Sequence, residues 1–349
     1  MPMNDTRLSE NASSHNQVRH WAEMAKAHAQ PDTRRSVMQL MTTVLPLAGL
    51  WVAMMITVGD AYWITLILSV PAAAFLVRLF IIQHDCGHRS FFRSRGLNDK
   101  LGALIGVMTL TPHAYWRQAH NTHHATCGNL TKRGIGDVNV LTVKEYVNLP
   151  KWKRMVYRAY RNPMTILGVG PIYLFFIKYR LPLDLIRSQP KLLVSVMGTN
   201  LGILGAVTGL GYAFGFLEVL MVQLPVSLIA SATGVWLFYV QHQFERTFWK
   251  EERDWDFYAA SVLASSFYDL PKLLNWFTGC IGIHHIHHLS NRIPNYRLSA
   301  CLNDMPELRQ VNRIGLRDSL SCFKLALWDE ARQRLISFRT LTRSRRQSR

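Results

Sequence analysis

The sequence contains few acidic residues and two long stretches without any basic residue. Of 349 residues, 22 are Asp or Glu and 40 are Lys or Arg, which gives a formal charge of +18. No Lys or Arg occurs in residues 36–77 or 192–245, and 49% of all residues are hydrophobic. The mean hydropathy is nevertheless only +0.03, because strongly apolar and strongly polar segments alternate. This composition excludes an acidic or disordered polar chain and does not fit a single soluble globule.

The two stretches predict four membrane-spanning helices arranged as two hairpins. About 20 apolar residues cross the ~30 Å hydrocarbon core, so each stretch can cross twice. Asp60 and Glu218 lie near the middle of the stretches, where a hairpin turn would meet water. The predicted spans are roughly 37–57, 61–82, 193–214 and 217–240. All Lys and Arg then lie on one side, which the positive-inside rule makes cytosolic. We therefore expect a multi-pass protein of the plasma (inner) membrane with both termini in the cytosol.

Two shorter apolar runs leave the number of membrane-embedded segments open. The runs 101–110 and 164–177 are shorter than a spanning helix, and the second contains Gly168, Gly170 and Pro171. We expect both runs to be interfacial or re-entrant. The alternative is a six-span arrangement, which would move basic segments across the membrane.

The chain lacks the features of a secreted or repeat protein. Residues 1–35 are polar and contain no signal-peptide core, and the five cysteines form no C-x-x-C pair. We expect a polar cytosolic segment (1–35), a membrane domain (36–300) and a cytosolic helical C-terminal segment with a basic tail (301–349). The positive charge flanks the predicted spans, so we expect it to meet anionic lipid headgroups and not nucleic acid.

Helical patterns extend beyond the predicted spans. Residues 144–161 mix basic residues with Trp and Tyr, which is typical of a helix at a membrane interface, although a solvated basic helix would look the same. Periodicity at about 254–274 and 316–338 predicts further helices. In the second, the apolar residues at helical spacing are Leu325, Ala326, Trp328 and Ala331. The prediction is an all-α membrane protein with four spans and a cytosolic helical lobe.

Eight of the 14 histidines occur in three tight clusters. The clusters are HDCGH with His84 and His88, HNTHH with His120, His123 and His124, and HHIHH with His284, His287 and His288. On a helix, residues i, i+3 and i+4 share one face, so each cluster can direct two or three imidazoles at one point. Imidazole is a common ligand of iron, zinc and copper. The clusters therefore predict a metal site.

The predicted topology brings the clusters together and adds a ninth histidine. His84 follows the second span and His242 follows the fourth, so both lie at the same cytosolic surface. Nine candidates exceed the roughly four to six ligands of one ion and predict a two-metal site. His285 points away from the shared face of its cluster. The histidines that lack partners at ligand spacing, and that we expect to be surface or packing residues, are His15, His20, His28 and His113.

Carboxylates near the clusters could hold the imidazole N–H groups. Such partners orient ligating histidines and compensate for the charge of the metal. Asp85, Asp137 and Glu245 are placed for this role, although each could equally be a surface or capping carboxylate. Asn275, nine residues before His284, could orient a ligand or a water molecule.

Taken together, these motifs resemble the membrane fatty acid desaturase family over roughly residues 35–300. The similar segments are HDCGHRSFF, HNTHHATCGNLTKRGIGD, LFYVQHQFE and LPKLLNWFTGCIGIHHIHHLSNRIPNYRL, and they match the acyl-lipid branch, which includes delta-12 and omega-6 types. The resemblance implies two irons that use O2 and two electrons to introduce a cis double bond into an acyl chain. It implies as ligands His84, His88, His120, His123, His124, His284, His287 and His288, with His242 as an additional histidine.

The resemblance also implies partners and contains one departure. The acyl chain would be carried by a lipid. No cytochrome b5-like domain with its HPGG motif is present, so electrons would come from a separate carrier, such as a small acidic ferredoxin steered by the basic cytosolic face. Acyl-CoA members hold a metal-bound water with an asparagine four residues before the additional histidine, where this chain has Phe238. The departure favours the acyl-lipid branch and leaves the coordination of that iron open.

Other functions remain open from the sequence. A hydroxylase or ketolase acting on an alkane, sterol or carotenoid would use the same kind of site with a different channel. A di-zinc hydrolase would also use imidazole ligands, although no H-E-x-x-H is present. A metal transporter is disfavoured, because the predicted spans contain almost no ionisable residues.

Overall fold

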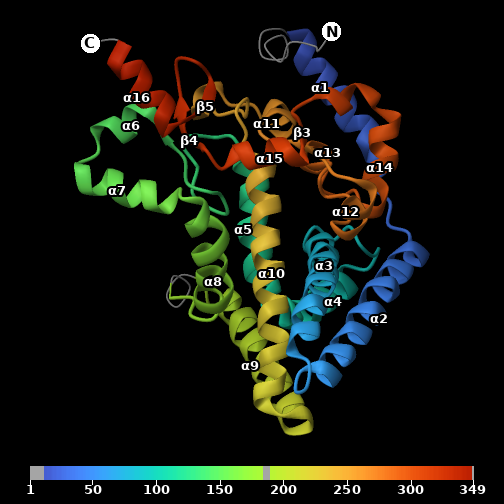
Figure 1. Ribbon diagram of the computed structural model, residues 1–349. Helices are drawn as coiled ribbons and strands as arrows, with labels where there is room; N and C mark the ends of the chain where they lie inside the picture. The colour runs from blue at the N-terminus through green and yellow to red at the C-terminus, as the bar shows by residue number, and fades with distance from the viewer. Residues whose placement is uncertain (1–11, 184–188, 348–349) are drawn as a thin grey trace.

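Four long helices form two hairpins, as the sequence predicts. The computed structural model describes residues 12–183 and 189–347. Helices α2 (Thr33–Thr57) and α3 (Tyr62–Gly87) form the first hairpin, and α9 (Pro190–Phe214) and α10 (Phe216–His242) form the second (Figure 1). Among the described residues, these four helices are long and apolar enough to cross a membrane. Only 17% of the most apolar window of α2 and 11% of that of α9 is buried, so their apolar side chains face outward, as lipid-facing helices require.

The two shorter apolar runs form short helical segments. The first lies in α4 (Arg95–Met108). The second is divided into η2 (Thr165–Val169), α8 (Gly170–Ile172) and η3 (Tyr173–Lys178), of which η2 and η3 are π-helical. Neither run is long enough to span. Their interfacial or re-entrant placement stays a prediction.

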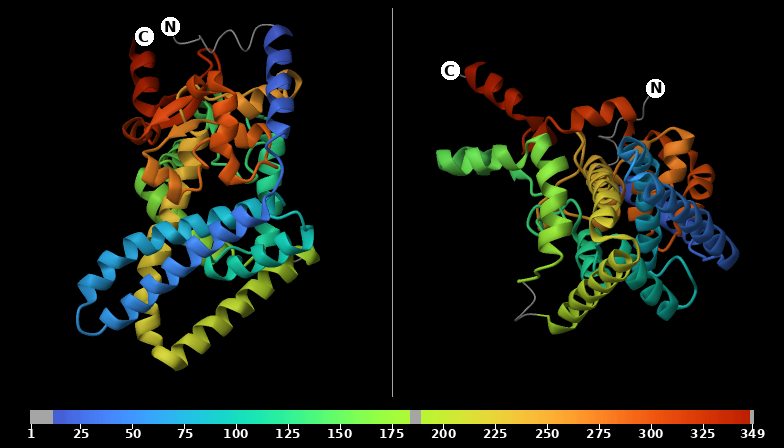
Figure 2. Two further views of the ribbon diagram at one scale, coloured as in Figure 1. Left: turned by 90° about the vertical axis from the view of Figure 1, so that its right-hand side faces the viewer. Right: turned by 60° about the horizontal axis from the view of Figure 1, so that its bottom comes forward.

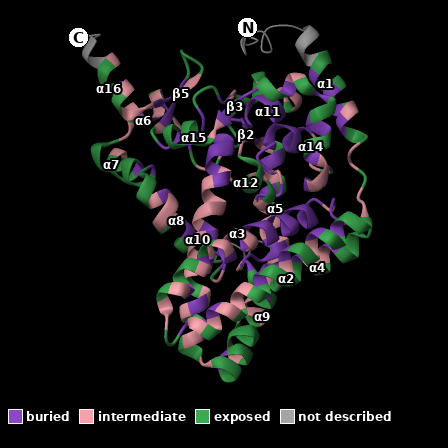
Figure 3. Ribbon diagram, turned by 45° about the vertical axis from the view of Figure 1, so that its right-hand side comes forward, coloured by how far each residue is buried: buried purple, intermediate pink, exposed green. Residues whose placement is uncertain are grey.

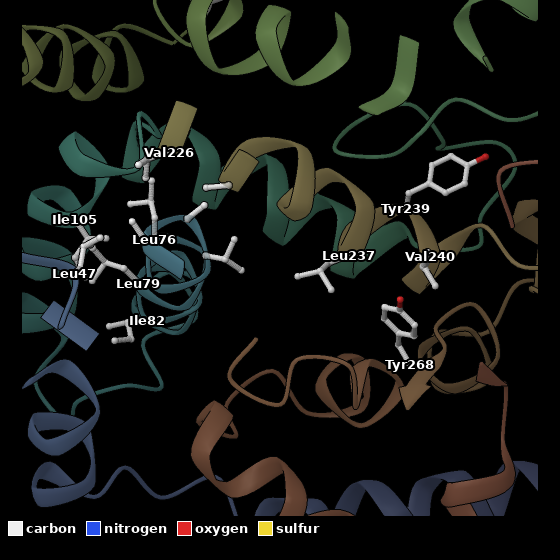
Figure 4. Close-up of a cluster of buried hydrophobic side chains, with 14 of the residues drawn as sticks. Leu47, Leu76, Leu79, Ile82, Ile105, Val226, Leu237, Tyr239, Val240 and Tyr268 are labelled. Atoms are coloured by element: carbon white, nitrogen blue, oxygen red, sulfur yellow. The ribbon is translucent and has the colours of Figure 1, made fainter. Parts of the chain in front are cut away.

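Helix α3 is the central element of the membrane part. It packs against α2, α4 and α10, and most of its C-terminal half is buried (Figure 3). The shared core contains Leu76, Leu79 and Ile82 of α3, with Leu47 of α2 and Val226 of α10 (Figure 4). This packing fixes the C-terminal end of α3, where the first histidine cluster begins.

Most of the other helices form a lobe at one end of the hairpins (Figures 1 and 2). They are α1 (Ala12–Lys26), α6 (Val143–Asn148), α7 (Lys151–Tyr160), α11 (Phe257–Leu263), α12 (Lys272–Phe277), α13 (His284–Leu289), α14 (Asn295–Asp304), α15 (Leu316–Cys322) and α16 (Phe338–Gln347), with the 3-10 turns η4 (Glu252–Asp254) and η5 (Pro306–Gln310). Helix α5 (His113–Thr126) packs against α3, α4 and α9 and runs beside α10 below the lobe (Figure 1). Of the predicted N-terminal segment, residues 1–11 lie outside the described residues. Helix α1 packs against α11 and α13 and so covers part of the lobe.

The helix predicted over 316–338 is wrong in its C-terminal half. After α15 the chain forms an antiparallel hairpin of β4 (Leu325–Asp329) and β5 (Arg334–Ser337), and β1 (Leu141–Thr142) pairs parallel with β4. The turn between the strands explains the difference. The Asp329 carboxylate accepts the main-chain N–H groups of Ala331 and Arg332, and Gln333 adopts a left-handed conformation with a φ of +49°. Ala331 thus lies in a turn, and no single helical stripe exists.

The helix predicted over 254–274 is also interrupted. Helix α11 ends at Leu263, and β2 (Phe267–Asp269) pairs parallel with β3 (Arg313–Gly315) before α12 begins after Pro271. Proline has no N–H to continue a helix, and Pro271 stands directly before α12 as its N-cap residue. The fold is therefore mostly helical, as predicted, with two small sheets that periodicity did not reveal.

Candidate metal centre

The three histidine clusters and His242 meet where the lobe joins the long helices. His84 lies in the last turn of α3 and His88 directly follows that helix. The second cluster lies in the C-terminal half of α5, the third lies in the short helix α13, which begins at His284, and His242 is the last residue of α10. Helix ends are packed together here because α3, α5 and α10 belong to one bundle and α13 sits against α11 in the lobe. Segments far apart in the sequence therefore direct their imidazoles at one region.

The nine histidines form two buried groups. The members of each group lie within 4.8 Å of one another when one nitrogen from each ring is compared. One group contains His84, His88, His120, His124 and His287. The other contains His123, His242, His284 and His288. The structure thus brings all nine sequence candidates together and divides them into five and four.

Hydrogen bonds at Nδ1 determine which ring nitrogen is free. His123 Nδ1 donates to Asp137 Oδ1, His84 Nδ1 to Asp85 Oδ1 (3.1 Å), and His242 Nδ1 to the main-chain oxygen of Ala264 (3.0 Å). A neutral imidazole carries a proton on one nitrogen only, so these three rings present a lone pair at Nε2. This is the tautomer that a metal ligand needs.

The free nitrogens face one another in a way that fits a bound cation. His242 Nε2 lies 3.1 Å from His123 Nε2 and 3.0 Å from His284 Nε2. The first pair cannot be a hydrogen bond, because both nitrogens carry lone pairs. Two nitrogens that bind one ion at about 2.1 Å and at right angles to each other lie about 3 Å apart. In the other group, Nε2 of His84 and both nitrogens of His88 are buried without a hydrogen-bond partner.

Burial keeps these histidines in the neutral form that binds metals. Removal from water, with neighbouring imidazoles as the next cause, lowers the pKa of ligand candidates outside the four long helices well below the usual value for histidine. The side chains concerned are His88, His120, His124, His284, His287 and His288. The donor set therefore fits two divalent cations of the iron or zinc type.

Two of the proposed orienting residues contact histidines, and two do not. Asp85 and Asp137 hold His84 and His123. The Glu245 carboxylate is 58% exposed and pairs with Arg334 Nη1 at 2.9 Å instead. Asn275 lies half-buried in α12, and its recorded hydrogen bonds are main-chain bonds.

The orienting asparagine is Asn295, which the sequence analysis did not identify. Its N–H and its Nδ2 donate to Asp85 Oδ2 at 2.7 and 2.8 Å, and its Oδ1 accepts from Gln39 Nε2 at 2.8 Å. Asn295 therefore links α2, α3 and the start of α14. The sequence offered one signal, an asparagine directly after Pro294 at a helix start close to the third cluster.

The remaining histidines lie outside both groups. His285 is buried and donates from Nε2 to the main-chain oxygen of Leu308 at 3.1 Å. His113 is buried against Gly102, His28 contacts Asp304, and His20 is exposed. The side chain of His15 lies outside the described residues.

An apolar cavity of about 450 Å³ reaches the histidines. It is lined mainly by apolar side chains of α3, α5, α10 and the 165–178 segment, and it reaches His84, His120 and His284. Phe238 lines it too, with its ring centroid 5.2 Å from that of His123 and 5.1 Å from that of His242. The volume and the apolar lining are typical of a site for a small hydrophobic molecule.

Comparison with known proteins identifies the family of the chain. A family model of fatty acid desaturases matches residues 61–316. A fatty acid desaturase of Bacillus subtilis is 42% identical over 334 residues, which are 96% of this chain and 94% of that protein. An sn-1 acyl-lipid omega-3 desaturase (ferredoxin) of Nostoc is 26% identical over 63% of this chain and 61% of its own length. An sn-1 oleoyl-lipid 12-desaturase of Synechocystis is 25% identical over 66% and 65%.

Proposed function

Since this chain belongs to the fatty acid desaturase family and is an integral membrane oxidoreductase, we propose that it desaturates acyl chains carried by membrane lipids, at two irons held by nine histidines. The observation that carries the proposal is the pair of buried histidine groups beside an apolar cavity. The function as a membrane fatty acid desaturase follows from the family. The carrier of the acyl chain, the metal and the individual ligands are the proposed part.

Each histidine group would hold one iron. The first iron would bind His84, His88, His120, His124 and His287, and the second would bind His123, His242, His284 and His288. Together they would supply the oxidation of a CH2–CH2 pair to a cis CH=CH by O2, two electrons and two protons, with release of two water molecules. The protein orients the imidazoles through Asp85, Asp137 and the Ala264 carbonyl. Phe238 covers the second group with an apolar ring and keeps water from that side.

The cavity supports an acyl chain as the reacting part of the substrate. An acyl chain offers no polar handle near its middle, so apolar walls must position one pair of methylenes by shape alone. Relatives that act on acyl lipids support a lipid carrier. The similarity to 12-desaturases is only 24–25%, so it supports the acyl-lipid branch and not a particular bond position within the delta-12 or omega-6 types.

The electron donor proposed for this enzyme is a separate acidic carrier of the ferredoxin type. Two relatives carry ferredoxin in their names. The net charge of +18 would attract an acidic carrier protein to the cytosolic surface of this chain. We place the lobe and both termini on the cytosolic side of the plasma (inner) membrane, because most of the basic residues belong to the lobe and none occurs in residues 36–77 or 192–245.

Expression in a host that lacks polyunsaturated lipids tests the proposal. We expect gas chromatography with mass spectrometry of the fatty acid methyl esters to show a product lighter by two hydrogens. A product that has gained one oxygen would identify the hydroxylase alternative instead, and one that has gained an oxygen and lost two hydrogens would identify the ketolase alternative. Feeding the acyl chain as a lipid or as a free thioester to membranes shows which carrier is used.

Single-histidine variants test the ligand assignment. Replacement of any of the nine histidines by Ala should remove most of the activity and lower the iron content, because each would leave one coordination position empty. His285→Gln is the matched control, since His285 belongs to the third cluster but lies outside both groups. Near-normal iron and activity in several of the nine variants would contradict the assignment.

A further inference from the structure

Helix α7 carries an apolar face that no other part of the described chain covers. Trp152, Met155 and Val156 share one face by their i, i+3 and i+4 spacing and are 62%, 70% and 60% exposed. Tyr160 extends this face toward the end of the helix. A soluble helix normally turns such a face toward the core, so its exposure here requires an external partner.

The opposite face of α7 is attached to the lobe by polar contacts. Tyr157 is buried, and its hydroxyl donates to the main-chain oxygen of Ala326 at 2.6 Å. Arg158 Nε donates to the hydroxyl of Tyr146 at 2.7 Å, and its guanidinium lies 4.9 Å from the centre of the Phe338 ring. These contacts fix the rotation of α7 about its axis. The apolar face is therefore held outward by the fold.

The surroundings identify a lipid surface as the partner. Figure 1 shows α7 running across the direction of α10, near the histidine-bearing end of that helix. The chain continues from α7 into the 165–178 segment, which packs on α10 and exposes Val169 and Ile177. Met164, between α7 and this segment, is 79% exposed, so exposed apolar side chains recur along the chain from α7 to the segment that packs on α10. Lys151 and Lys153 are exposed beside the apolar face of α7, and a helix with Trp on one face and Lys on its flanks suits an interface with anionic headgroups.

We propose that α7 is an in-plane membrane anchor that binds anionic phospholipid headgroups through Lys151 and Lys153 and places Trp152, Met155 and Val156 at the boundary between headgroups and acyl chains. Tyr160 connects this anchor to the cavity, because its side chain lines the cavity and its hydroxyl accepts the N–H of Asn139 at 3.0 Å. Docking of α7 therefore holds one wall of the cavity at the depth of the headgroups. The role as a cavity wall rests on the proposed function, whereas the docking itself does not.

Site-specific fluorescence of the full-length protein in lipid nanodiscs tests the docking without any measurement of activity. A bimane label is placed by Met155→Cys in a Cys280→Ser background, because the other four native cysteines are buried. We expect strong quenching by lipids that carry a nitroxide near the headgroup and weak quenching by aqueous iodide. The matched control is a label placed by Arg332→Cys in the β4–β5 turn, which should respond to iodide alone.

The headgroup assignment is tested in the same labelled protein with Lys151→Gln and Lys153→Gln. Each basic residue near an anionic surface changes the ratio of docked to undocked helix by about fivefold. We expect lipid quenching to fall and iodide quenching to rise with each replacement, and also when the anionic lipid is replaced by a zwitterionic lipid. Quenching by iodide alone would show that the face of α7 lies in water and would overturn the anchor. Quenching by neither agent would show that a second protein covers the face, and it would overturn the anchor too. Lipid quenching that is independent of charge would overturn the anionic headgroup.

Discussion

Replacement of Asp85 by Asn tests whether the hydrogen bonds at Nδ1 prepare the histidines for metal binding. Asp85 accepts three hydrogen bonds: one from His84 Nδ1 and two from Asn295. An asparagine at position 85 has one acceptor oxygen and one donor amide group. The variant must therefore satisfy either Asn295 or the ligating tautomer of His84, and it cannot satisfy both.

The magnitude follows from counting these bonds. If the amide oxygen faces His84, two buried donors of Asn295 lose their acceptor, at a cost of about 1–3 kcal/mol each. If the oxygen faces Asn295, the amide N–H faces His84 Nδ1 and places the histidine proton on Nε2, where it blocks metal binding. The second arrangement is favoured by at least about 2 kcal/mol, or roughly thirtyfold. We expect Asp85→Asn to weaken iron binding by this factor or more, which agrees with the usual 10–100-fold effect of such partners.

Iron affinity and product formation measure this effect. Purified protein is equilibrated with buffered ferrous iron, the bound metal is quantified by mass spectrometry, and fatty acid products are measured in the same preparation. Glu245→Gln is the control, because the sequence suggests the same role for Glu245 while the structure pairs its exposed carboxylate with Arg334. Parent-like iron affinity in Asp85→Asn, or an equal loss in Glu245→Gln, would refute the reasoning.

Three further predictions concern packing, pH and the second histidine group. A side chain at Gly102 would overlap the ring of His113, so Gly102→Ala should lower the free energy of unfolding by about 1–3 kcal/mol. Gly96→Ala is the control in the same helix, because an added Cβ there meets no atom within 4 Å, and thermal unfolding measures both variants. Burial lowers the pKa of His113 to about 4, so the unfolded chain binds more protons than the folded chain between pH ~6.5 and that value. The free energy of unfolding should therefore fall as the pH drops through this window. His113→Asn should reduce the slope of the free energy of unfolding against pH by up to about 1.4 kcal/mol per pH unit. Gly136 has a φ of +74°, and a Cβ there would lie 2.8 Å from a main-chain oxygen of α5. Gly136→Ala should therefore displace Asp137 and lower iron binding about 10–100-fold. Gly134→Ala controls for backbone strain, because Gly134 also has a positive φ (+103°) but no atom within 4 Å of an added Cβ, and it should not show this loss.

The long apolar helices could be predicted because length and hydrophobicity alone determine them. The spans needed no knowledge of tertiary contacts, and the structure confirms all four within a few residues. The C-terminal segment shows the opposite case. Leu327 and Trp328 are both buried, but they lie on opposite faces of β4 and belong to different core clusters. A strand that is buried on both faces has apolar residues at consecutive positions, and such a short apolar run cannot be distinguished from a buried helix by its spacing. The turn at Asp329 distinguishes the two structures, because its carboxylate accepts the main-chain N–H of Ala331, a turn contact to which the spacing of apolar residues is blind.

The same contrast applies to the site. The three clusters could be recognised because ligand spacing on a helix is a local property. His242 could be added because the predicted topology places the end of the fourth span at the same membrane surface. The partners of the imidazoles are not local. Asp85 and Asp137 lie close to their histidines in the sequence, but Asn295 reaches Asp85 from 210 residues away. Glu245 follows His242 by three residues and still faces Arg334, because the chain leaves α10 after His242 and turns toward β5.

The position of the histidines at helix ends has an electrostatic consequence. An imidazole is uncharged when it binds a metal, so two divalent cations would bring four positive charges into a buried region. Asp85 and Asp137 provide two negative charges. Helices α3, α5 and α10 all end at the site, and the C-terminus of a helix is equivalent to roughly half a negative charge, which adds about 1.5 more. The carboxylates and the helix ends together nearly balance the metals. Because helix ends also carry the proposed ligands, any change that frays the last turn of α3 or α10 would remove a proposed ligand and its compensating charge at once.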